Sequence, residues 1–283
     1  MGASSRLVKS NELGLKKRLG QHFLRDTGVL ERIVRWIKPA SDDIFLDIGA
    51  GDGALSVGLA PRVARLLAIE VDADCIPELQ RALARFGNAT VIVGDILQLD
   101  LAELVSPHSQ HNRKLRVAGN LPYHIATAII EKLLHSLLPI EDLFFMVQLE
   151  VAQRIIACPG SRQYGFLSVH CQHHSDIQMG FKVSPACFVP RPRVSSAILS
   201  FRPKPASRDP FWEVDFDALA KAAFSYRRKT LENSLCKHPV FGKISQALLS
   251  QADIDGSRRA EALSLSEYER LVHVFHSCFS PRL

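Results

Sequence analysis

The residues best suited to chemistry lie in the stretch 119–125. Asn120 offers a side-chain carbonyl that accepts hydrogen bonds. Pro122 biases Leu121 toward an extended conformation that can present the Leu121 carbonyl outward, and Tyr123 supplies a flat aromatic face. Two acceptors beside a stacking ring suit adenine or cytosine, because the exocyclic amine of either base can donate to both. Holding the amine in this way would draw its lone pair out of ring conjugation and leave it able to attack an electrophile.

The flanking residues place this stretch at the end of a strand. An apolar run over residues 115–118 predicts a buried strand, and residues 126–138 have the spacing of a helix. In open α/β sheets, ligands bind outside the carboxyl ends of the strands, where this stretch would lie. The alternative is a plain strand-to-helix turn in which Asn120 caps the helix.

A glycine-rich turn after the apolar residues 43–48 is the second candidate binding element. Gly49, Gly51 and Gly53 allow positive φ angles and close approach of a ligand to the backbone. Their G-x-G-x-G spacing differs from the G-x-G-x-x-G of dinucleotide-binding turns, so the motif alone also fits a tight connection. A second apolar strand ends about 20 residues later in Glu70, whose carboxylate can accept both hydroxyls of a ribose.

Four predicted strands bring polar residues to one edge of a single sheet. After the third strand, at residues 90–93, Asp95 and Ile96 could hold an adenine ring through its amino group, although a turn capped by Asp95 explains these residues equally well. Helices predicted between the strands indicate an α/β fold with a parallel sheet. The residues expected at successive carboxyl ends are Gly49, Glu70, Asp95 and Asn120.

Further along the chain, the sequence predicts a stiff loop, a strand and a helical part. Phe188 stands on a proline-rich loop before a strand at residues 197–201, and it could close over a flat ligand opposite Tyr123 or pack in the core. Residues 203–210 have the composition of a linker. Helices are predicted over residues 217–236, 243–251 and 266–275.

Basic residues suggest a polyanionic partner. Among the first 25 residues, six are basic and one is acidic, whereas the rest of the 283-residue chain is nearly neutral overall. Such an arm favours nucleic acid over a membrane, because it has no strong apolar face; a solvated terminus and a mitochondrial leader are the alternatives. Arg227, Arg228 and Lys229, expected on the first C-terminal helix, could contact phosphates or form a solvated face.

Several other classes of protein are disfavoured. No run approaches the roughly 18 apolar residues that span a bilayer. The six cysteines are scattered without a Cys-x-x-Cys pair, which predicts reduced thiols in a cytosolic protein. His170, Cys171, His173 and His174 stand close together, but neighbours on a helix cannot all converge on one ion. We therefore expect them to form helix surface and core rather than a metal site.

Taken together, these motifs resemble those of the KsgA/Dim1 family, the small-subunit ribosomal RNA adenine dimethyltransferases. The sequence departs from the family pattern at Asp47, where Glu is frequent, at Ala50, where Pro is frequent, and at His124, where Asn is common. The motifs occur in the family's order, at residues 20–24, 47–51, 69–70, 94–95, 120–123, 164–169, 188–192, 227–231 and 259–261.

The resemblance implies a fold and an activity. We expect a Rossmann-like sheet of the class I S-adenosylmethionine-dependent methyltransferases with helices on both faces, and a small C-terminal all-α domain. The expected limits are a flexible basic N-terminus at 1–15, a methyltransferase domain at 16–203, a linker at 204–210 and a helical RNA-recognition domain at 211–283. The implied substrate is a pair of adjacent adenosines in the 3′-terminal hairpin loop of small-subunit (16S) rRNA, within a pre-30S-like particle. We expect a cytoplasmic monomer that needs neither metal nor membrane.

The resemblance also implies residue roles. Asn120 and the Leu121 carbonyl would orient the N6 amine, while Tyr123 and Phe188 would sandwich the base, so the catalytic group is Asn120, Leu121, Pro122, Tyr123 and Phe188. The residues expected to bind S-adenosyl-L-methionine are His22, Leu24, Gly49, Gly51, Glu70, Asp95, Ile96 and Asn120. The residues expected to bind RNA are Lys16, Lys17, Arg18, Arg191, Arg227, Arg228 and Lys229.

Three other functions were considered. A large-subunit (23S) rRNA adenine dimethylase of the macrolide-resistance type usually has Ile where Leu121 stands. A nucleic-acid-binding relative without catalysis is disfavoured by the intact motif 120–123 together with Glu70 and Asp95. A NAD-dependent dehydrogenase is disfavoured by the glycine spacing.

Overall fold

The computed structural model describes residues 21–108, 115–205 and 209–279. The chain divides into two compact units. The first unit contains the described residues up to Gln148 together with Gly180–Ile198, and the second contains Leu149–Met179 and the described residues from Leu199 onward. The expected segments at 1–15 and at the middle of the 204–210 linker fall outside the described residues, and the predicted domain limits stay a prediction.

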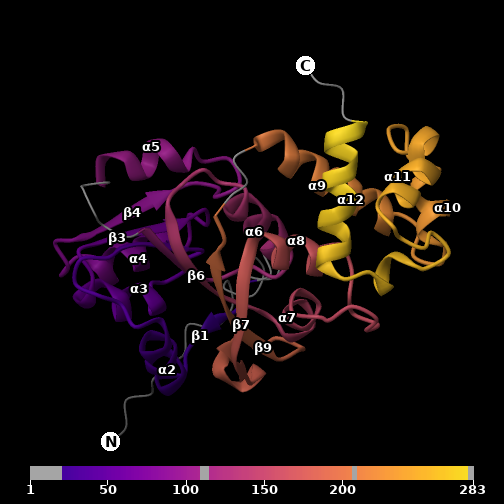
Figure 1. Cartoon of the computed structure of the whole chain (residues 1–283). Helices are drawn as coiled ribbons and strands as arrows, with labels where there is room; N and C mark the ends of the chain where they lie inside the picture. The colour runs from indigo at the N-terminus through magenta and orange to yellow at the C-terminus, as the bar shows by residue number, and fades with distance from the viewer. Residues whose placement is uncertain (1–20, 109–114, 206–208, 280–283) are drawn as a thin grey trace, which may run out of the picture. The chain divides into compact units, whose positions relative to one another are not determined.

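The main sheet has seven strands in the order β4-β3-β2-β5-β6-β9-β7 (Figure 1). The pairs of neighbours from β4 to β6 are parallel. All five residues of β2 are buried, as expected for a central strand covered on both faces. The strands are β2 (Ile44–Ile48), β3 (Arg65–Glu70), β4 (Ala89–Val93), β5 (Leu115–Asn120), β6 (Ile140–Gln148), β7 (Ser175–Val183) and β9 (Ser196–Pro203).

The strand order reverses between β2 and β5. From β2 the chain adds β3 and then β4 on one side, whereas β5 and β6 extend the sheet on the other side. Asp47 of β2 pairs with Ala118 of β5, and Glu70 of β3 pairs with Val93 of β4, so these strands end at nearly the same level. A reversal of this kind leaves a crevice at the carboxyl ends, where ligands bind in open α/β sheets.

Helices pack against this sheet in the first unit. The side chain of Asp26 accepts a hydrogen bond from the Val29 amide and so caps the first helix, and the left-handed conformation of Lys38 ends it. The helices of this unit are α2 (Thr27–Ile37), α3 (Ala54–Leu59), α4 (Ile76–Leu83), α5 (Leu101–Val105) and α6 (Ala126–Leu134). Residues of α2, α3 and α4 share one apolar core with the strands.

A short antiparallel pair, β1 (Phe23–Leu24) and β8 (Phe188–Val189), lies in the same unit. Its register places Leu24 opposite Phe188. Residues 21–24, which lie far from the glycine turn in the sequence, are thereby fixed to the loop before β9.

The second unit is mostly helical around its own core. Tyr268 is fully buried there, and its hydroxyl donates to the carbonyl of Ala260 over 2.9 Å. Its helices are α7 (Leu149–Ile155), α8 (Phe166–His174), α9 (Pro210–Phe224), α10 (Leu231–Leu235), α11 (Ser245–Gln251) and α12 (Leu265–Cys278). Short 3-10 turns in the chain cover Ala60–Arg62, Ser106–His108, Pro185–Cys187, Gly242–Ile244 and Ala260–Ala262.

One expectation about secondary structure is wrong, and one strand was not expected. The predicted helix at 217–236 is broken, because α9 ends at Phe224 and the Thr230 side chain caps α10 by accepting from the Asn233 amide. Arg227, Arg228 and Lys229 therefore lie in an exposed turn between helices. Strand β7 was not predicted, although its apolar residues alternate with exposed ones along the strand.

The predicted α/β class with an additional helical part is confirmed. Of the helices within the described residues, none is both long enough and apolar enough to cross a bilayer.

Candidate functional site

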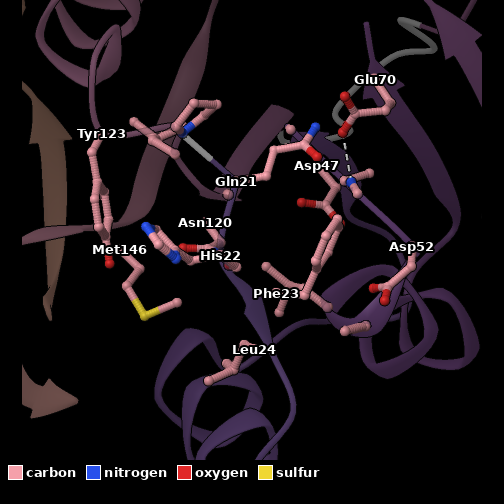
Figure 2. A pocket seen from close by; sticks show the side chains of 18 of the residues that line it. Gln21, His22, Phe23, Leu24, Asp47, Asp52, Glu70, Asn120, Tyr123 and Met146 are labelled. Atoms are coloured by element: carbon pink, nitrogen blue, oxygen red, sulfur yellow. Dashed lines mark hydrogen bonds between the residues drawn. The ribbon is translucent and has the colours of Figure 1, made fainter. Parts of the chain in front are cut away.

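A pocket opens at the carboxyl ends of β2, β3 and β5, within the first unit. Figure 2 shows the carboxylates of Asp47, Asp52 and Glu70 on one side and Tyr123 with Met146 on the other. The pocket is lined by nine of the residues that the sequence analysis selected, which are His22, Leu24, Gly49, Gly51, Glu70, Asn120, Leu121, Pro122 and Tyr123. The structure thus brings together side chains from positions 22 to 123 of the chain.

The glycine turn forms one wall by its backbone. Gly49 and Gly51 have φ angles of 68° and 57°, in the left-handed region that glycine adopts without strain. A Cβ atom on Gly51 would lie 3.0 Å from the Phe23 ring, so a side chain here would crowd the pocket. The Gly49 amide donates to the carbonyl of Ile69 over 3.0 Å, which ties the turn to β3.

The carboxylate of Glu70 is buried and held by backbone amides. Its Oε2 accepts from Gly51 over 2.7 Å, and its Oε1 accepts from Val71 and Asp72 over 2.9 Å each. A carboxylate can accept about four hydrogen bonds, so room remains for a ligand hydroxyl. Glu70 therefore couples the glycine turn to the end of β3 and still faces the pocket.

Asp47 is a second buried carboxyl in the lining, and the sequence analysis noted it only as part of a motif. Burial raises the pKa of Asp47 to about 7, the hydrogen bond from Ser56 lowers this pKa, and the nearby Glu70 raises it. The Ser56 hydroxyl donates to Asp47 Oδ2 over 2.5 Å. Asp47, Asp52 and Glu70 place three acidic side chains in the pocket lining, and such a lining favours a ligand that carries positive charge.

The orientation of Asn120 is set by the N-terminal segment. Its Nδ2 lies 2.9 Å from the backbone carbonyl of His22. Because a carbonyl can only accept, the atom facing it must be the amide NH2, and the side-chain oxygen of Asn120 is directed elsewhere. Among the described residues, no hydrogen-bond donor is recorded for that oxygen. The following residue, Leu121, is anchored by its own amide, which donates to the Met146 carbonyl over 3.1 Å.

Close packing of β5 against β2 supports this arrangement. A Cβ atom on Gly119 would lie 2.4 Å from the Ile48 carbonyl oxygen, closer than any side chain can approach. Only glycine allows the two strands to meet at this level, directly before Asn120.

The ring of Tyr123 is held from two sides. Its hydroxyl lies 2.6 Å from the Ser196 hydroxyl at the start of β9. Its centroid lies 5.3 Å from the His22 ring, and the His22 Nδ1 lies 2.8 Å from the Pro190 carbonyl. Burial raises the pKa of the Tyr123 hydroxyl, whereas the hydrogen bond to Ser196 lowers it. The hydroxyl therefore stays protonated at neutral pH, and the ring offers a fixed flat surface.

Three predicted site residues lie outside the pocket lining. Asp95 accepts a hydrogen bond from the Leu97 amide over 2.9 Å, as a turn-capping Asp does, and Ile96 is buried beside it. Phe188 is 2% exposed and packs in the core with Leu24. A stacking role for Phe188 would therefore require its ring to become exposed, and the roles assigned to these residues stay predictions.

The residues predicted to bind RNA lie elsewhere. Arg191 is exposed on the loop after β8, and Arg227, Arg228 and Lys229 are exposed in the second unit. Lys16, Lys17 and Arg18 fall outside the described residues.

Sequence reasoning missed several lining residues, namely Gln21, Phe23, Asp52, Phe144, Met146 and Ile198. Phe23 and Gln21 stand beside the selected His22, which was the available signal. Met146 and Ile198 lie on β6 and β9, and nothing in the sequence distinguishes them from ordinary core residues.

The reversed strand order, the glycine turn and the pocket at the switch point define a Rossmann-like methyltransferase of class I. A sequence model of the family "Ribosomal RNA adenine dimethylase" matches residues 13–277, and the chain belongs to this family. The predicted family, enzyme class and activity are thereby confirmed.

Known proteins resemble the chain over most of its length. The "Ribosomal RNA small subunit methyltransferase A" of Latilactobacillus sakei subsp. sakei (strain 23K) is 39% identical over 278 residues, which cover 95% of this chain and 92% of that protein. A solved dimethyladenosine transferase from Plasmodium falciparum superposes with a TM-score of 0.77 at 25% identity, covering 90% of this chain and 98% of the other. The 23S rRNA methyltransferase ErmE superposes with a TM-score of 0.66 at 23% identity, covering 90% and 99%, which shows a shared fold.

Proposed function

We propose that this chain transfers methyl groups from S-adenosyl-L-methionine to the N6 amines of two adjacent adenosines in the 3′-terminal hairpin loop of small-subunit rRNA. The observation that carries the proposal is the orientation of Asn120, whose NH2 group is bound to the His22 carbonyl. The side-chain oxygen is thereby left to accept from an amine in the pocket. The name of the Latilactobacillus relative supports the small subunit as the source of the RNA.

The acidic side of the pocket suits the methyl donor, which supplies an electrophilic methyl group on a positively charged sulfonium. Glu70 would accept the ribose hydroxyls, and the backbone at Gly49 and Gly51 would lie against the donor. His22 and Leu24 would line its methionine end. Asp95 and Ile96, one strand further along the sheet edge, would hold its adenine.

The other side of the pocket suits the target base. Asn120 through its side-chain oxygen and Leu121 through its backbone carbonyl would accept the two N6 hydrogens. Tyr123 would stack on the base, with Pro122 setting the bend of the motif, and Phe188 would complete the sandwich once its ring is exposed. Placing the base costs less in a hairpin loop than in a duplex, because fewer stacks must be broken.

The chemistry asks little of the protein beyond position. The N6 nitrogen forms a bond to the methyl carbon as the carbon–sulfur bond breaks, and the nitrogen then loses a proton to water. Since the leaving group is a neutral thioether, the residues need to orient the amine and exclude competing nucleophiles, without a covalent intermediate.

RNA would be held by charge outside the pocket. Arg191, Arg227, Arg228 and Lys229 are exposed and can contact phosphates, and the basic residues Lys16, Lys17 and Arg18 would extend this contact. We infer that the acceptor is a pre-30S-like particle in the cytoplasm, and that the chain acts as a monomer.

The test is methyl transfer from labelled S-adenosylmethionine to purified ribosomal subunits that lack this modification. We expect label in small subunits, and mass mapping should find it as paired dimethyladenosines in the 3′-terminal hairpin. Label confined to large subunits would identify the macrolide-resistance type of activity instead. Tight binding to RNA without transfer to either subunit would identify a non-catalytic relative.

A further inference from the structure

A group of potential metal ligands lies in the second unit, whereas the proposed transfer pocket lies in the first. His173 and His174 end α8, and Glu213 stands on α9. One ligand atom from each of the three lies within 4.8 Å of the others. His173 Nε2 is 3.1 Å from Glu213 Oε2, and His174 Nδ1 is 3.9 Å from the same oxygen.

The hydrogen bonds of His173 require a cation at this point. Its Nδ1 lies 3.1 Å from Glu269 Oε1, and its Nε2 lies 3.1 Å from Glu213 Oε2. A neutral imidazole has one N–H, so it can donate to only one of the two carboxylates. Its other nitrogen would then present a lone pair to the second carboxylate, which is a repulsive contact. The second contact becomes favourable when either a proton or a metal ion lies between Nε2 and Glu213.

The partner on the far side of the ring is the kind that supports a metal ligand. A histidine that binds a metal through one nitrogen commonly donates its other N–H to a carboxylate, which fixes the tautomer and the ring orientation. Glu269 occupies that position behind His173. The Nε2 lone pair then faces Glu213, whose Oε2 also lies 3.9 Å from His174 Nδ1.

The side chains are also held in place before any ion arrives. The His173 ring stacks on Phe216 with a centroid distance of 3.8 Å and an interplanar angle of 21°, and Trp212 lies 5.2 Å away. The side chains of His173, His174 and Glu213 are 10–18% exposed, and the residues line a surface pocket through which an ion can enter.

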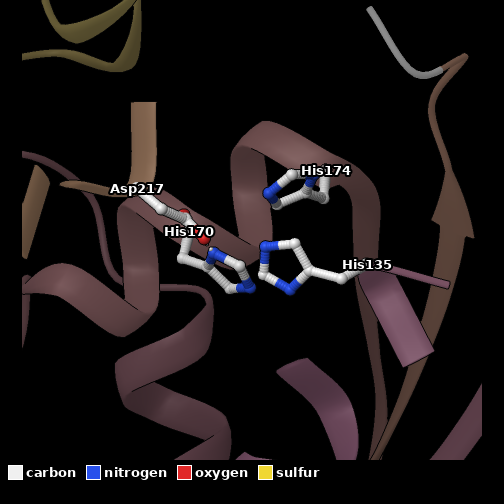
Figure 3. Close-up of side chains that lie close together, drawn as sticks. All are labelled: His135, His170, His174 and Asp217. Atoms are coloured by element: carbon white, nitrogen blue, oxygen red, sulfur yellow. Dashed lines mark hydrogen bonds and ion pairs between the residues drawn. The ribbon is translucent and has the colours of Figure 1, made fainter. Parts of the chain in front are cut away.

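Two other polar side chains near these ligands have partners of their own. Lys204 also lines the pocket, but its Nζ donates to the Gln172 carbonyl over 2.7 Å and faces Asp176. Figure 3 shows His170, on the same helix as His174, directed at Asp217, and its Nδ1 lies 2.8 Å from Asp217 Oδ1.

The geometry points to a divalent metal site, of the borderline class represented by Zn²⁺, formed by His173, His174 and Glu213. Two imidazole nitrogens, one carboxylate oxygen and a water molecule make a common tetrahedral zinc set. The ion joins α8 to α9 inside the second unit and takes no part in methyl transfer. No metal site was expected from the sequence, because neighbouring residues on one helix cannot all converge on one ion. Glu213 from α9 supplies the missing direction.

Zinc content and thermal unfolding of the full chain test this site. After treatment with a chelator and dialysis, the chain is incubated with ZnCl2 and its bound zinc and Tm are measured. We expect the wild type to retain one more zinc ion per chain than Glu213→Gln does. Its Tm should rise by roughly 5 to 10 °C when the free zinc concentration is a hundred times Kd. Glu269→Gln should keep the site with an affinity weakened about 10- to 100-fold. MgCl2 should give no such rise, because imidazole suits zinc better than magnesium.

His276 provides a matched control. Its two nitrogens lie 2.8 Å from Asp215 and 2.9 Å from Asp209, the same bracketing by two acids, but among the described residues no group of three potential metal ligands forms there. His276→Gln should therefore bind zinc like the wild type, and any zinc held by the exposed cysteines is common to all variants. Equal zinc content and equal Tm response in the wild type and Glu213→Gln would overturn the proposal.

Discussion

The hydroxyl groups of Tyr123 and Ser196 lie 2.6 Å apart, which joins the turn after β5 to the start of β9. Ser196 is fully buried, so its hydroxyl is fixed and in turn fixes the edge of the tyrosine ring. Under the proposed function, Ser196 positions the surface on which the target adenine stacks.

Ser196→Ala should lower kcat/KM for the RNA about three- to tenfold, since one hydrogen bond that orients Tyr123 is lost. Tyr123→Phe removes the same bond from the other end and should have a similar effect. The double variant should be little worse than either single variant. Kinetics of methyl transfer measure this, and fully additive losses would show that the two hydroxyls act separately.

Asn120→Ala should reduce kcat by about 100-fold or more, because the amine of the target base loses an oriented acceptor. Binding of S-adenosylhomocysteine, measured by calorimetry, should change much less, since Glu70 and the glycine turn remain. Methyl transfer retained by the Asn120→Ala, Glu70→Ala double variant would remove the basis for the proposed site.

Glu70→Gln should weaken the donor site and the fold together. Both carboxylate oxygens accept from backbone amides, so an NH2 group in place of either one would oppose an N–H. We expect about 1–3 kcal/mol lower stability in urea unfolding and weaker binding of S-adenosylhomocysteine. An unchanged unfolding midpoint would mean that these amide contacts are dispensable.

Asp47→Asn should change how stability depends on pH. The folded chain raises the pKa of Asp47 to about 7, whereas an aspartate in the unfolded chain ionises near 4. Between these values the folded state holds a proton that the unfolded state has lost, so this residue makes stability fall as pH rises through that window. The free energy of unfolding of Asp47→Asn, relative to that of the wild type, should therefore rise by about 2–4 kcal/mol as the pH increases from 4 to 8. Urea unfolding across this range checks the slope, and a pH-independent difference would contradict it.

Gly119→Ala should destabilise the chain by about 3 kcal/mol or more, because the new methyl group would lie 2.4 Å from the Ile48 carbonyl oxygen. Gly87→Ala is the matched control, since a Cβ atom there has no heavy atom within 4 Å among the described residues. That variant should unfold within about 1 kcal/mol of the wild type. Equal unfolding midpoints for the two variants would show that β2 and β5 can move apart.

Local patterns in the sequence were enough for the central part of the sheet. Apolar runs predicted β2 to β6. Gly49, Glu70 and Asn120, at the ends of β2, β3 and β5, line one pocket because parallel strands end at a common edge, whereas Asp95 after β4 lies outside the lining. The prediction failed where the end of a helix depends on a single capping side chain. Thr230 caps the separate helix α10, although the apolar spacing continues across residues 217–236.

Residue type and spacing by themselves determined the family, the α/β class and nine of the residues that line the pocket, because these follow from motifs and apolar patterns that are local in the sequence. Only the tertiary structure decided which atoms face the pocket. The NH2 of Asn120 is committed to His22, 98 positions away, Phe188 is buried in the core, and His173 meets Glu213 across two helices. Such pairings are determined by packing between distant segments, which one-dimensional periodicity does not encode.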